Sequence, residues 1–217
     1  MKKHQSGFTL VEIAIVLVII GLLLGGVLKG QSMIESAKVK ALANEMKAVQ
    51  AAYYAYEDKF KAIPGDDAKS TTHLGATVNG VAIVDPTPAT AGDSLINTGT
   101  WVGAAVPVAT NENALFWMHT RAAGLMTGDA GSGVAVNSAG GALGIGSTAI
   151  VTGLSGSTFV CTGGIDGKLA LQLDTAMDDG KPNGGAIQAT AGTAIVAAAA
   201  AATSYAAGTA YTVCMGI

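Results

Sequence analysis

The chain opens with a short polar segment followed by a long apolar one. Residues 1–7, MKKHQSG, are basic and polar, whereas residues 8–28, FTLVEIAIVLVIIGLLLGGVL, carry a single charge, Glu12. At about 1.5 Å per residue, a helix over residues 8–28 spans roughly 31 Å, the thickness of a bilayer's hydrocarbon core. The pattern predicts a transmembrane helix, and Lys2 and Lys3 favour a cytoplasmic N-terminus.

Apolar side chains then recur at alternating intervals of three and four. They are Val39, Leu42, Met46, Val49, Tyr53, Tyr56, Phe60 and Ile63. This period predicts that the helix continues over residues 29–63 with one apolar face and charged residues on the other faces. Pro64-Gly65 is expected to end it, because proline and glycine break helices.

Residues beyond the long helix show weaker patterns. Turn-forming residues dominate residues 66–108, which we expect to be a connecting loop in which Val81–Val84 forms a short strand. Residues 111–126 predict a second helix, capped by Asn111 or Asn113. Further strands are expected at residues 149–154, 158–162, 168–173 and 211–214, and the alternation of residues 168–173 is the clearest. The alanine-rich residues 194–202 suit either helix or strand.

The second helix contains large side chains whose role has to be weighed. Phe116, Trp117 and Leu125 are expected in the core or at a subunit interface rather than in a ligand-binding site. His119 is expected on the surface of the helix rather than as a ligand to a metal.

Composition and charge narrow the classes of function. Half of the residues are apolar but only 5% are aromatic, and 30 are glycine, which favours a domain rich in loops or strands with small side chains. Without Lys2 and Lys3 the chain has 10 basic and 15 acidic side chains, so it is poorly suited to binding nucleic acid phosphates. The sequence contains no P-loop, HExxH or Gly-x-Ser-x-Gly motif, and we expect no catalytic site.

The chain has two cysteines, Cys161 and Cys214. An even pair in an exported protein favours one disulfide, and two separate free thiols are the alternative. Closing a loop of roughly fifty residues stabilises the fold by about 4 kcal/mol in the chain-entropy model.

Gly7 and Glu12 suggest that the apolar helix is retained after processing. A secretory signal has a small-residue cleavage site after its apolar run, whereas here the small residue Gly7 precedes it. A carboxylate inside an apolar span costs about 2.5–3.5 kcal/mol on insertion scales. Cleavage at Gly7–Phe8 creates an α-amino group one helical turn from Glu12, and the two charges then neutralise each other within or between chains. Alternatively, Glu12 lies near the membrane edge and reaches water.

The sequence Gly7-Phe8-Thr9-Leu10-Val11-Glu12, followed by the apolar run, resembles the class III signal of type IV prepilins and type II secretion pseudopilins. The resemblance covers about the first 30 residues. It implies cleavage after Gly7 by a prepilin peptidase, N-methylation of Phe8, and contact of Glu12 with the N-terminus of an adjacent subunit. It also implies a pilin-like α+β fold, in which a long N-terminal helix, half transmembrane and half amphipathic, packs on a C-terminal antiparallel sheet.

The same resemblance implies an organisation of the chain into a leader, a helix and a head. The leader is residues 1–7, the transmembrane and filament-core helix is residues 8–28, and its amphipathic continuation is residues 29–63. The globular head is residues 64–217, with a disulfide-bounded region over residues 161–214.

The expected function is that of a structural subunit of a type IV pilus-like filament that serves adhesion, motility or surface interaction. The precursor would cross the inner membrane once, be processed by the prepilin peptidase and methylase, and be assembled by pilus or type II secretion machinery into a helical homo-oligomer. The filament would be an extracellular pilus or a periplasmic pseudopilus. A pseudopilin or a minor pilin is the alternative within the family, and a monomeric membrane-anchored binding module is the alternative outside it.

An acidic segment near the C-terminus is a candidate metal site. Asp174, Asp178, Asp179 and Asn183 supply oxygen ligands at short spacing within a glycine-rich loop, which suits Ca²⁺. Their spacing does not match an EF-hand, and ordinary turns have the same composition. No cofactor other than calcium is expected.

Overall fold

The computed structural model describes residues 10–192 and 199–217 of the chain. Its longest element is helix α1, Leu10–Phe60. The chain divides into two compact units, Met1–Lys38 and Val39–Ile217, which are described separately. The first unit contributes the apolar part of α1, and the second contains the rest of α1 and every other helix and strand that the structure describes.

The predicted apolar stripe is the face of α1 that is buried in the second unit. Its buried residues are Val39, Leu42, Met46, Val49, Ala52, Tyr53 and Tyr56. The helix ends at Phe60, and Lys61 has a left-handed backbone with φ of 54°. The amphipathic helix predicted from the spacing is therefore confirmed, although it ends a few residues before Pro64.

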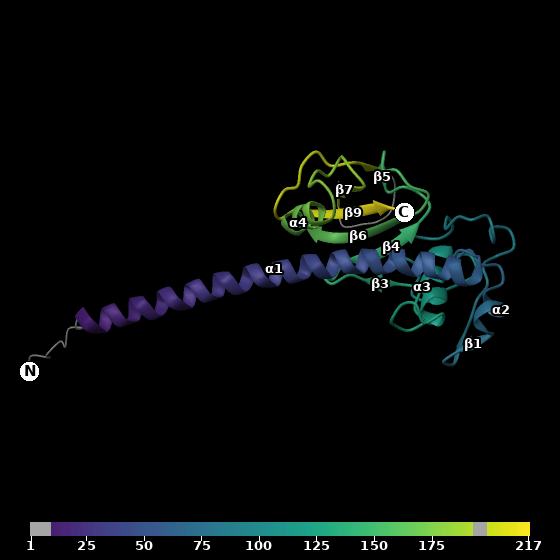
Figure 1. Ribbon diagram of the computed structural model, residues 1–217, viewed down its shortest axis with the longest axis horizontal. Helices are drawn as coiled ribbons and strands as arrows, with labels where there is room; N and C mark the ends of the chain where they lie inside the picture. The colour runs from purple at the N-terminus through teal and green to yellow at the C-terminus, as the bar shows by residue number, and fades with distance from the viewer. Residues whose placement is uncertain (1–9, 193–198) are drawn as a thin grey trace, which may run out of the picture. The chain divides into compact units, whose positions relative to one another are not determined.

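A five-stranded antiparallel sheet packs on this stripe, with strand order β3-β4-β6-β9-β7 (Figure 1). The strands are β3 (Ala135–Val136), β4 (Ala142–Gly146), β6 (Phe159–Asp166), β7 (Ile187–Ala191) and β9 (Ala210–Gly216). Strand β6 has a bulge between Thr162 and Ile165, where Gly164 takes a φ of 71° that glycine adopts without strain. The predicted α+β fold, a long helix on an antiparallel sheet, is confirmed.

The two faces of the sheet belong to different hydrophobic clusters. Val160 on β6 and Val213 on β9 pack in the cluster that contains α1, together with Leu143 and Ile145 of β4. Their neighbours Cys161 and Cys214 pack in a second cluster, with the side chains of Trp101, Ile150, Val151 and Leu154. This alternation follows from the two-residue repeat of a strand, which points successive side chains to opposite faces.

Residues 167–177 form a helix, α4 (Gly167–Met177), so the strand predicted at residues 168–173 is wrong. The Asp166 side chain caps the helix by accepting the Lys168 N–H at 2.9 Å. Ala170 and Leu173 lie one turn apart and are both buried, whereas Leu171 is 43% exposed. The spacing of the leucines is compatible with the two-residue repeat of a strand and with the 3.6-residue repeat of a helix. The Asp166 cap and the strong helix-forming residues favour the helix.

The second predicted helix is confirmed as α3 (Glu112–Ala122), with Asn111 as its cap: the Asn111 side chain accepts the Ala114 N–H at 2.9 Å. Phe116 and Trp117 are fully buried in the core, as predicted. His119 is also fully buried, so its expected position on the helix surface is wrong. The helix-surface prediction failed because segments distant in sequence cover this side of α3.

Short elements complete the second unit. The connecting segment contains helix α2 (Ser70–Leu74) and the hairpin strands β1 (Thr77–Val78) and β2 (Val81–Ala82). Strand β5 (Val151–Thr152) pairs in parallel with β8 (Ala199–Ala200). The strands expected at residues 81–84, 149–154, 158–162 and 211–214 all overlap observed strands. Of the alanine-rich residues 194–202, residues 194–198 lie outside the described residues, and Ala199–Ala200 form β8.

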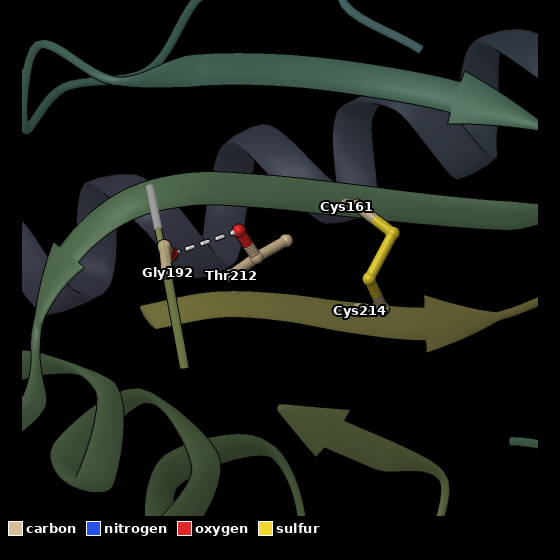
Figure 2. The surroundings of a disulfide bond; sticks show 4 residues. All are labelled: Cys161, Gly192, Thr212 and Cys214. Carbon is tan, nitrogen blue, oxygen red and sulfur yellow. Dashed lines mark hydrogen bonds between the residues drawn. A yellow bond between two sulfur atoms is a disulfide. The ribbon is translucent and has the colours of Figure 1, made fainter. Parts of the chain in front are cut away.

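Cys161 on β6 and Cys214 on β9 form a disulfide between neighbouring strands (Figure 2). The two residues are direct partners in the antiparallel register, with Cα atoms 4.1 Å apart, and both are fully buried. Next to it, the Thr212 hydroxyl donates to the Gly192 carbonyl at 3.2 Å. The disulfide joins the last strand, β9, to the central strand β6 across a sequence separation of 53 residues.

We predict that replacing both cysteines, Cys161→Ala and Cys214→Ala, lowers the free energy of unfolding by up to about 4 kcal/mol, because the open loop gains entropy in the unfolded chain. Denaturation of the full chain in detergent under oxidising conditions measures this loss. The matched control is reductant, which should destabilise the wild type and leave the double variant unchanged. Equal stability of the two oxidised proteins would contradict the prediction.

Candidate functional sites

The apolar part of α1 is exposed along its whole length. Large hydrophobic side chains from Leu10, which is 90% exposed, to Ile34 face outward. The most apolar 18-residue window has a mean hydropathy of 2.8 and none of it is buried, so by length and composition this helix is able to cross a membrane. Such a surface requires an apolar environment, because water disfavours contiguous exposed hydrocarbon.

Glu12 lies in the first turn of the described part of α1, in the apolar run. Gly7 and Phe8, the predicted cleavage site and new N-terminus, lie outside the described residues. The pairing of Glu12 with an N-terminal amine therefore stays a prediction. What the structure adds is that Glu12 is on a continuous helix with exposed apolar residues before and after it.

The acidic segment folds as a turn that gathers three of the four predicted metal ligands. Carboxylate oxygens of Asp174, Asp178 and Asp179 lie within 4.8 Å of one another. Asn183 is exposed on the turn that follows. Asp174 and Asp178 also hold the turn together: Asp174 accepts the Tyr205 hydroxyl at 2.6 Å, and Asp178 accepts the Ile187 N–H at 2.9 Å.

The charges of this turn are only partly compensated. Burial raises the pKa of Asp174, and the neighbouring carboxylates of Asp179 and Asp178 raise it further, while hydrogen bonds from Tyr205 and the Gly180 N–H oppose the rise. A divalent cation is one way to relieve this repulsion, and hydrogen bonds within the turn are another. Calcium binding thus stays a prediction.

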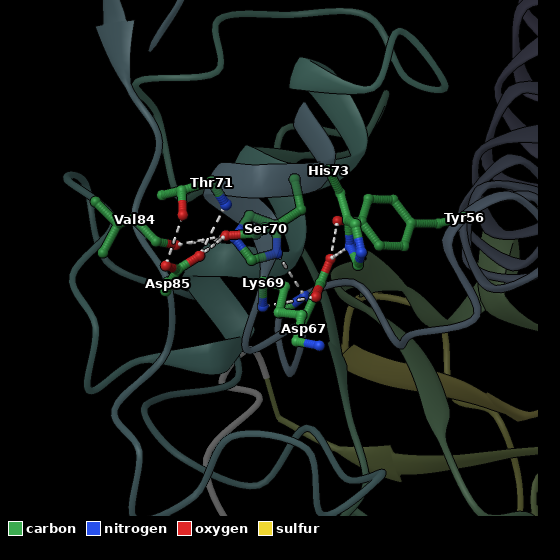
Figure 3. Close-up of polar contacts among 10 residues, drawn as sticks. Tyr56, Asp67, Lys69, Ser70, Thr71, His73, Val84 and Asp85 are labelled. Atoms are coloured by element: carbon green, nitrogen blue, oxygen red, sulfur yellow. Dashed lines mark hydrogen bonds and ion pairs between the residues drawn. The ribbon is translucent and has the colours of Figure 1, made fainter. Parts of the chain in front are cut away.

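A polar network that the sequence did not reveal lies where α1 ends (Figure 3). Its centre is the buried carboxylate of Asp67, whose Oδ2 accepts the Tyr56 hydroxyl at 2.7 Å and lies 2.7 Å from His73 Nδ1. The Lys69 N–H donates to Asp67 Oδ1 at 2.9 Å. Burial raises the pKa of Tyr56, and its hydrogen bond to Asp67 raises it further, so the phenol stays protonated as a donor.

Asp85 holds α2 in the same network. The Ser70 hydroxyl, the Thr71 N–H and the Thr71 hydroxyl all donate to its carboxylate, at 2.6–2.8 Å. Burial acts to raise the pKa of Asp85, but these hydrogen bonds outweigh it and the pKa is lowered. Asp85 is therefore held ionised and fixes the start of α2.

His119 joins α3 to this region by both of its ring nitrogens. Its Nδ1 accepts the Gly65 N–H at 3.0 Å, so the proton of the neutral ring is on Nε2, which donates to the Val84 carbonyl at 3.0 Å. The ring also stacks on Tyr56, with centroids 6.2 Å apart. Burial lowers the pKa of His119, consistent with a neutral imidazole that links three segments.

Beside this network lies a cavity of about 580 Å³. Phe60, Asp66, Asp67 and His73 line it, and the Phe60 and His73 rings stack with centroids 5.3 Å apart. In the sequence Asp66 and Asp67 follow Pro64-Gly65 and were interpreted only as turn formers. The sequence did place two acids, Asp66 and Asp67, a few residues before His73, which could have indicated a polar site. Nothing in the sequence indicated that residues 92–94 would fold over these acids.

The comparisons with known proteins agree with the N-terminal pattern. The family model described as the prokaryotic N-terminal methylation motif matches residues 2–28, and this motif is the prepilin signal of type IV pilins and pseudopilins. Neither the curated proteins nor the solved structures yielded a match to the chain. The motif and the apolar helix fit a membrane-anchored precursor that prepilin peptidase processes, and they point to a structural protein rather than an enzyme.

We predict that His119 makes the stability of the fold depend on pH. Its pKa is lowered from 6.5 in the folded chain, so the unfolded chain binds the extra proton first and the stabilisation is lost as pH falls below 6.5. The His119→Gln variant keeps a hydrogen-bond acceptor and a donor but does not titrate. Relative to this variant, the free energy of unfolding of the wild type should fall by up to about 1.4 kcal/mol for each pH unit below 6.5.

Denaturation of both proteins over a pH series measures this difference. Comparing the two proteins cancels the contribution of Asp66, whose raised pKa acts in the opposite direction. His73→Gln is the matched control and should leave the His119 contribution in place. A constant difference between wild type and His119→Gln across this range would contradict the prediction.

We predict that calcium, if it binds the acidic turn, raises the melting temperature of the wild type in a saturable way, because a ligand of the folded state stabilises it. Asp179→Asn should abolish the increase, since it removes one of the three converging charges. Asp58→Asn, which changes an exposed acid elsewhere, is the control. An equal effect of millimolar calcium on all three proteins, or no effect on any, would rule out the site.

Proposed function

We propose that this chain, which carries the methylation signal of type IV pilins and pseudopilins, is the precursor of a structural subunit of a pilus-like filament. The observation that carries the proposal is the match of residues 2–28 to that motif. Cleavage after Gly7 removes the basic leader and leaves Phe8 as an N-methylated N-terminus. The chain keeps its apolar helix, which a secreted monomer has no reason to retain.

The exposed apolar surface supports this proposal. Before assembly, the bilayer of the inner membrane covers the side chains of residues 10–28. After assembly, the same side chains need another apolar environment, and equivalent helices of neighbouring subunits provide it in the core of a helical filament. The folded head, Val39–Ile217, then has no need of the membrane because it has its own core.

Glu12 gives the assembly a register in this proposal. Its carboxylate costs about 2.5–3.5 kcal/mol in an apolar medium, and an opposite charge at hydrogen-bonding distance offsets that cost. The α-amino group created at Phe8 is such a charge, because its ordinary pKa is about 7.7–8. We propose that Glu12 of one subunit pairs with the N-terminus of an adjacent one, so that only processed chains assemble.

The partners in this proposal are the prepilin peptidase, which cleaves and methylates the precursor, and the machinery that builds a pilus or a type II secretion pseudopilus. The filament would be extracellular in the first case, serving adhesion, motility or surface interaction, and periplasmic in the second.

We predict that producing cells yield filaments of a chain that starts at methylated Phe8, and that Glu12→Val is inserted and processed but gives at least tenfold fewer filaments. Tenfold corresponds to about 1.4 kcal/mol, less than the cost of leaving the amine without its partner. Electron microscopy of sheared surface material and mass spectrometry of the subunit measure both. Ile13→Val is the matched control and should assemble normally.

The outcomes separate the alternatives. Processing at Phe8 without surface filaments would favour a pseudopilin or a minor pilin. A chain that still starts at Met1 would remove the basis of the assembly proposal and favour a simple membrane anchor. Unchanged filament yield for Glu12→Val would contradict the role of Glu12 alone.

A further inference from the structure

The cavity at the end of α1 has buried acids at its base and exposed charges at its rim. Asp66 is 3% exposed and Asp67 is 2% exposed, and both line the cavity. Glu57, Lys61 and Lys69 also line it and are exposed, so water screens their charges. A ligand that enters the cavity therefore meets a negative potential at the base that the rim lysines only weakly offset.

The two buried acids differ in how their charge is balanced. Asp67 accepts the Tyr56 hydroxyl and lies 2.7 Å from His73 Nδ1, a contact that is an ion pair when the imidazole is protonated. Both oxygens of Asp66, in contrast, accept only backbone N–H groups, from Gly92 and Ser94. Within the described residues no cationic side chain pairs with Asp66. Of the two rim lysines, Lys61 pairs instead with Asp58 at 3.0 Å, and its side chain is 77% exposed.

The electrostatics of Asp66 agree with this imbalance. Burial raises its pKa to about 6, and the carboxylates of Asp93 and Glu112 raise it further, although the backbone hydrogen bonds oppose the rise. The carboxylate is still mostly ionised at neutral pH, at a cost that a counter-charge removes. Each carboxylate oxygen has two lone pairs, so Asp66 retains acceptor sites for a further donor.

The walls of the cavity are fixed before any ligand arrives. Asp66 ties residues 92–94 to the loop after α1, and Asp67 ties Tyr56 to His73. The stacked rings of Phe60 and His73 form an aromatic side wall. A volume of about 580 Å³ is in the range of small-molecule sites, and preorganised walls reduce the entropy lost on binding.

We propose that this cavity binds a small organic cation of the primary ammonium class, with the ammonium group at Asp66 and its hydrocarbon part against Phe60 and His73. An ammonium group offers three donors to the free acceptor sites of the carboxylate, and aromatic rings favour both the cation and the alkyl chain. An anion would be repelled by Asp66, Asp67 and Glu57. This inference is independent of the filament proposal, because every residue concerned belongs to the head.

Saturation-transfer NMR with propylammonium and the full chain in detergent tests the proposal. Propylammonium should bind saturably at neutral pH, and propanol, which has a similar shape but no charge, should not. Binding should be about tenfold weaker at about pH 5, because a carboxyl group of pKa about 6 is then about nine-tenths protonated. Equal signals from propylammonium and propanol would overturn the proposal.

Variants locate the site. Asp66→Asn should abolish binding, and Ala68→Trp, which fills the mouth of the cavity without touching the hydrogen bonds of Asp66, should do the same. Asp179→Asn, which changes an exposed acid outside the cavity, is the matched control and should bind as the wild type does. Melting curves establish that each variant is folded. A folded Ala68→Trp or Asp66→Asn protein that binds propylammonium like the wild type would overturn the assignment.

The same ammonium chemistry is found in free amines and in lysine side chains of another copy of the chain. If the source is a lysine of another copy, saturating propylammonium should reduce the size of any assembly measured by light scattering. If the source is a free amine, propylammonium should bind and leave assembly size unchanged. Either result requires binding at the cavity, and an absence of binding to the wild type rejects both.

Discussion

The burial of one face of α1 against the sheet is the interaction on which the head depends. Five residues of that face share one hydrophobic cluster with side chains of strands β4, β6, β7 and β9; they are Val39, Leu42, Met46, Val49 and Tyr53. Each large apolar side chain contributes about 1.5–3 kcal/mol by leaving water. The sheet has few large aromatic residues of its own, so the helix supplies much of its core. Losing this contact would leave the α1 side of the sheet exposed.

A disulfide and a set of buried hydrogen bonds stabilise the parts of the head that the packing of α1 on the sheet does not reach. The disulfide between Cys161 and Cys214 secures the far face of the sheet, where only a small cluster around Trp101 covers it. The hydrogen bonds of His119 and Asp67 secure the end of α1, where the chain leaves the helix and the apolar stripe stops. The disulfide and these hydrogen bonds each join segments that are distant in sequence. Both therefore restrict the loops between those segments, one by a covalent bond and the other by polar contacts.

The molecule also separates its two kinds of surface. The apolar helix needs to be covered along residues 10–28, whereas the head buries most of its large apolar side chains and carries most of the chain's charge. In the proposed filament, this separation would let the helix move from a bilayer to the filament core without refolding of the head. The polar cavity, in turn, belongs to the head and is formed before any assembly.

Several elements could be predicted from the amino-acid sequence because they depend on local periodicity or on a short motif. These are the apolar run, the stripe of α1, helix α3 with an asparagine cap, and the prepilin signal around Gly7, because each is encoded in neighbouring residues. Tertiary structure alone decided the rest. The exception is the helix at residues 167–177, a local feature that the alternation concealed, because its cap Asp166 is two residues from Lys168. By contrast, His119 is buried because distant loops cover it, and the cavity exists only because residues 92–94 fold over Asp66. Such contacts join segments far apart in the chain, and no local pattern records them.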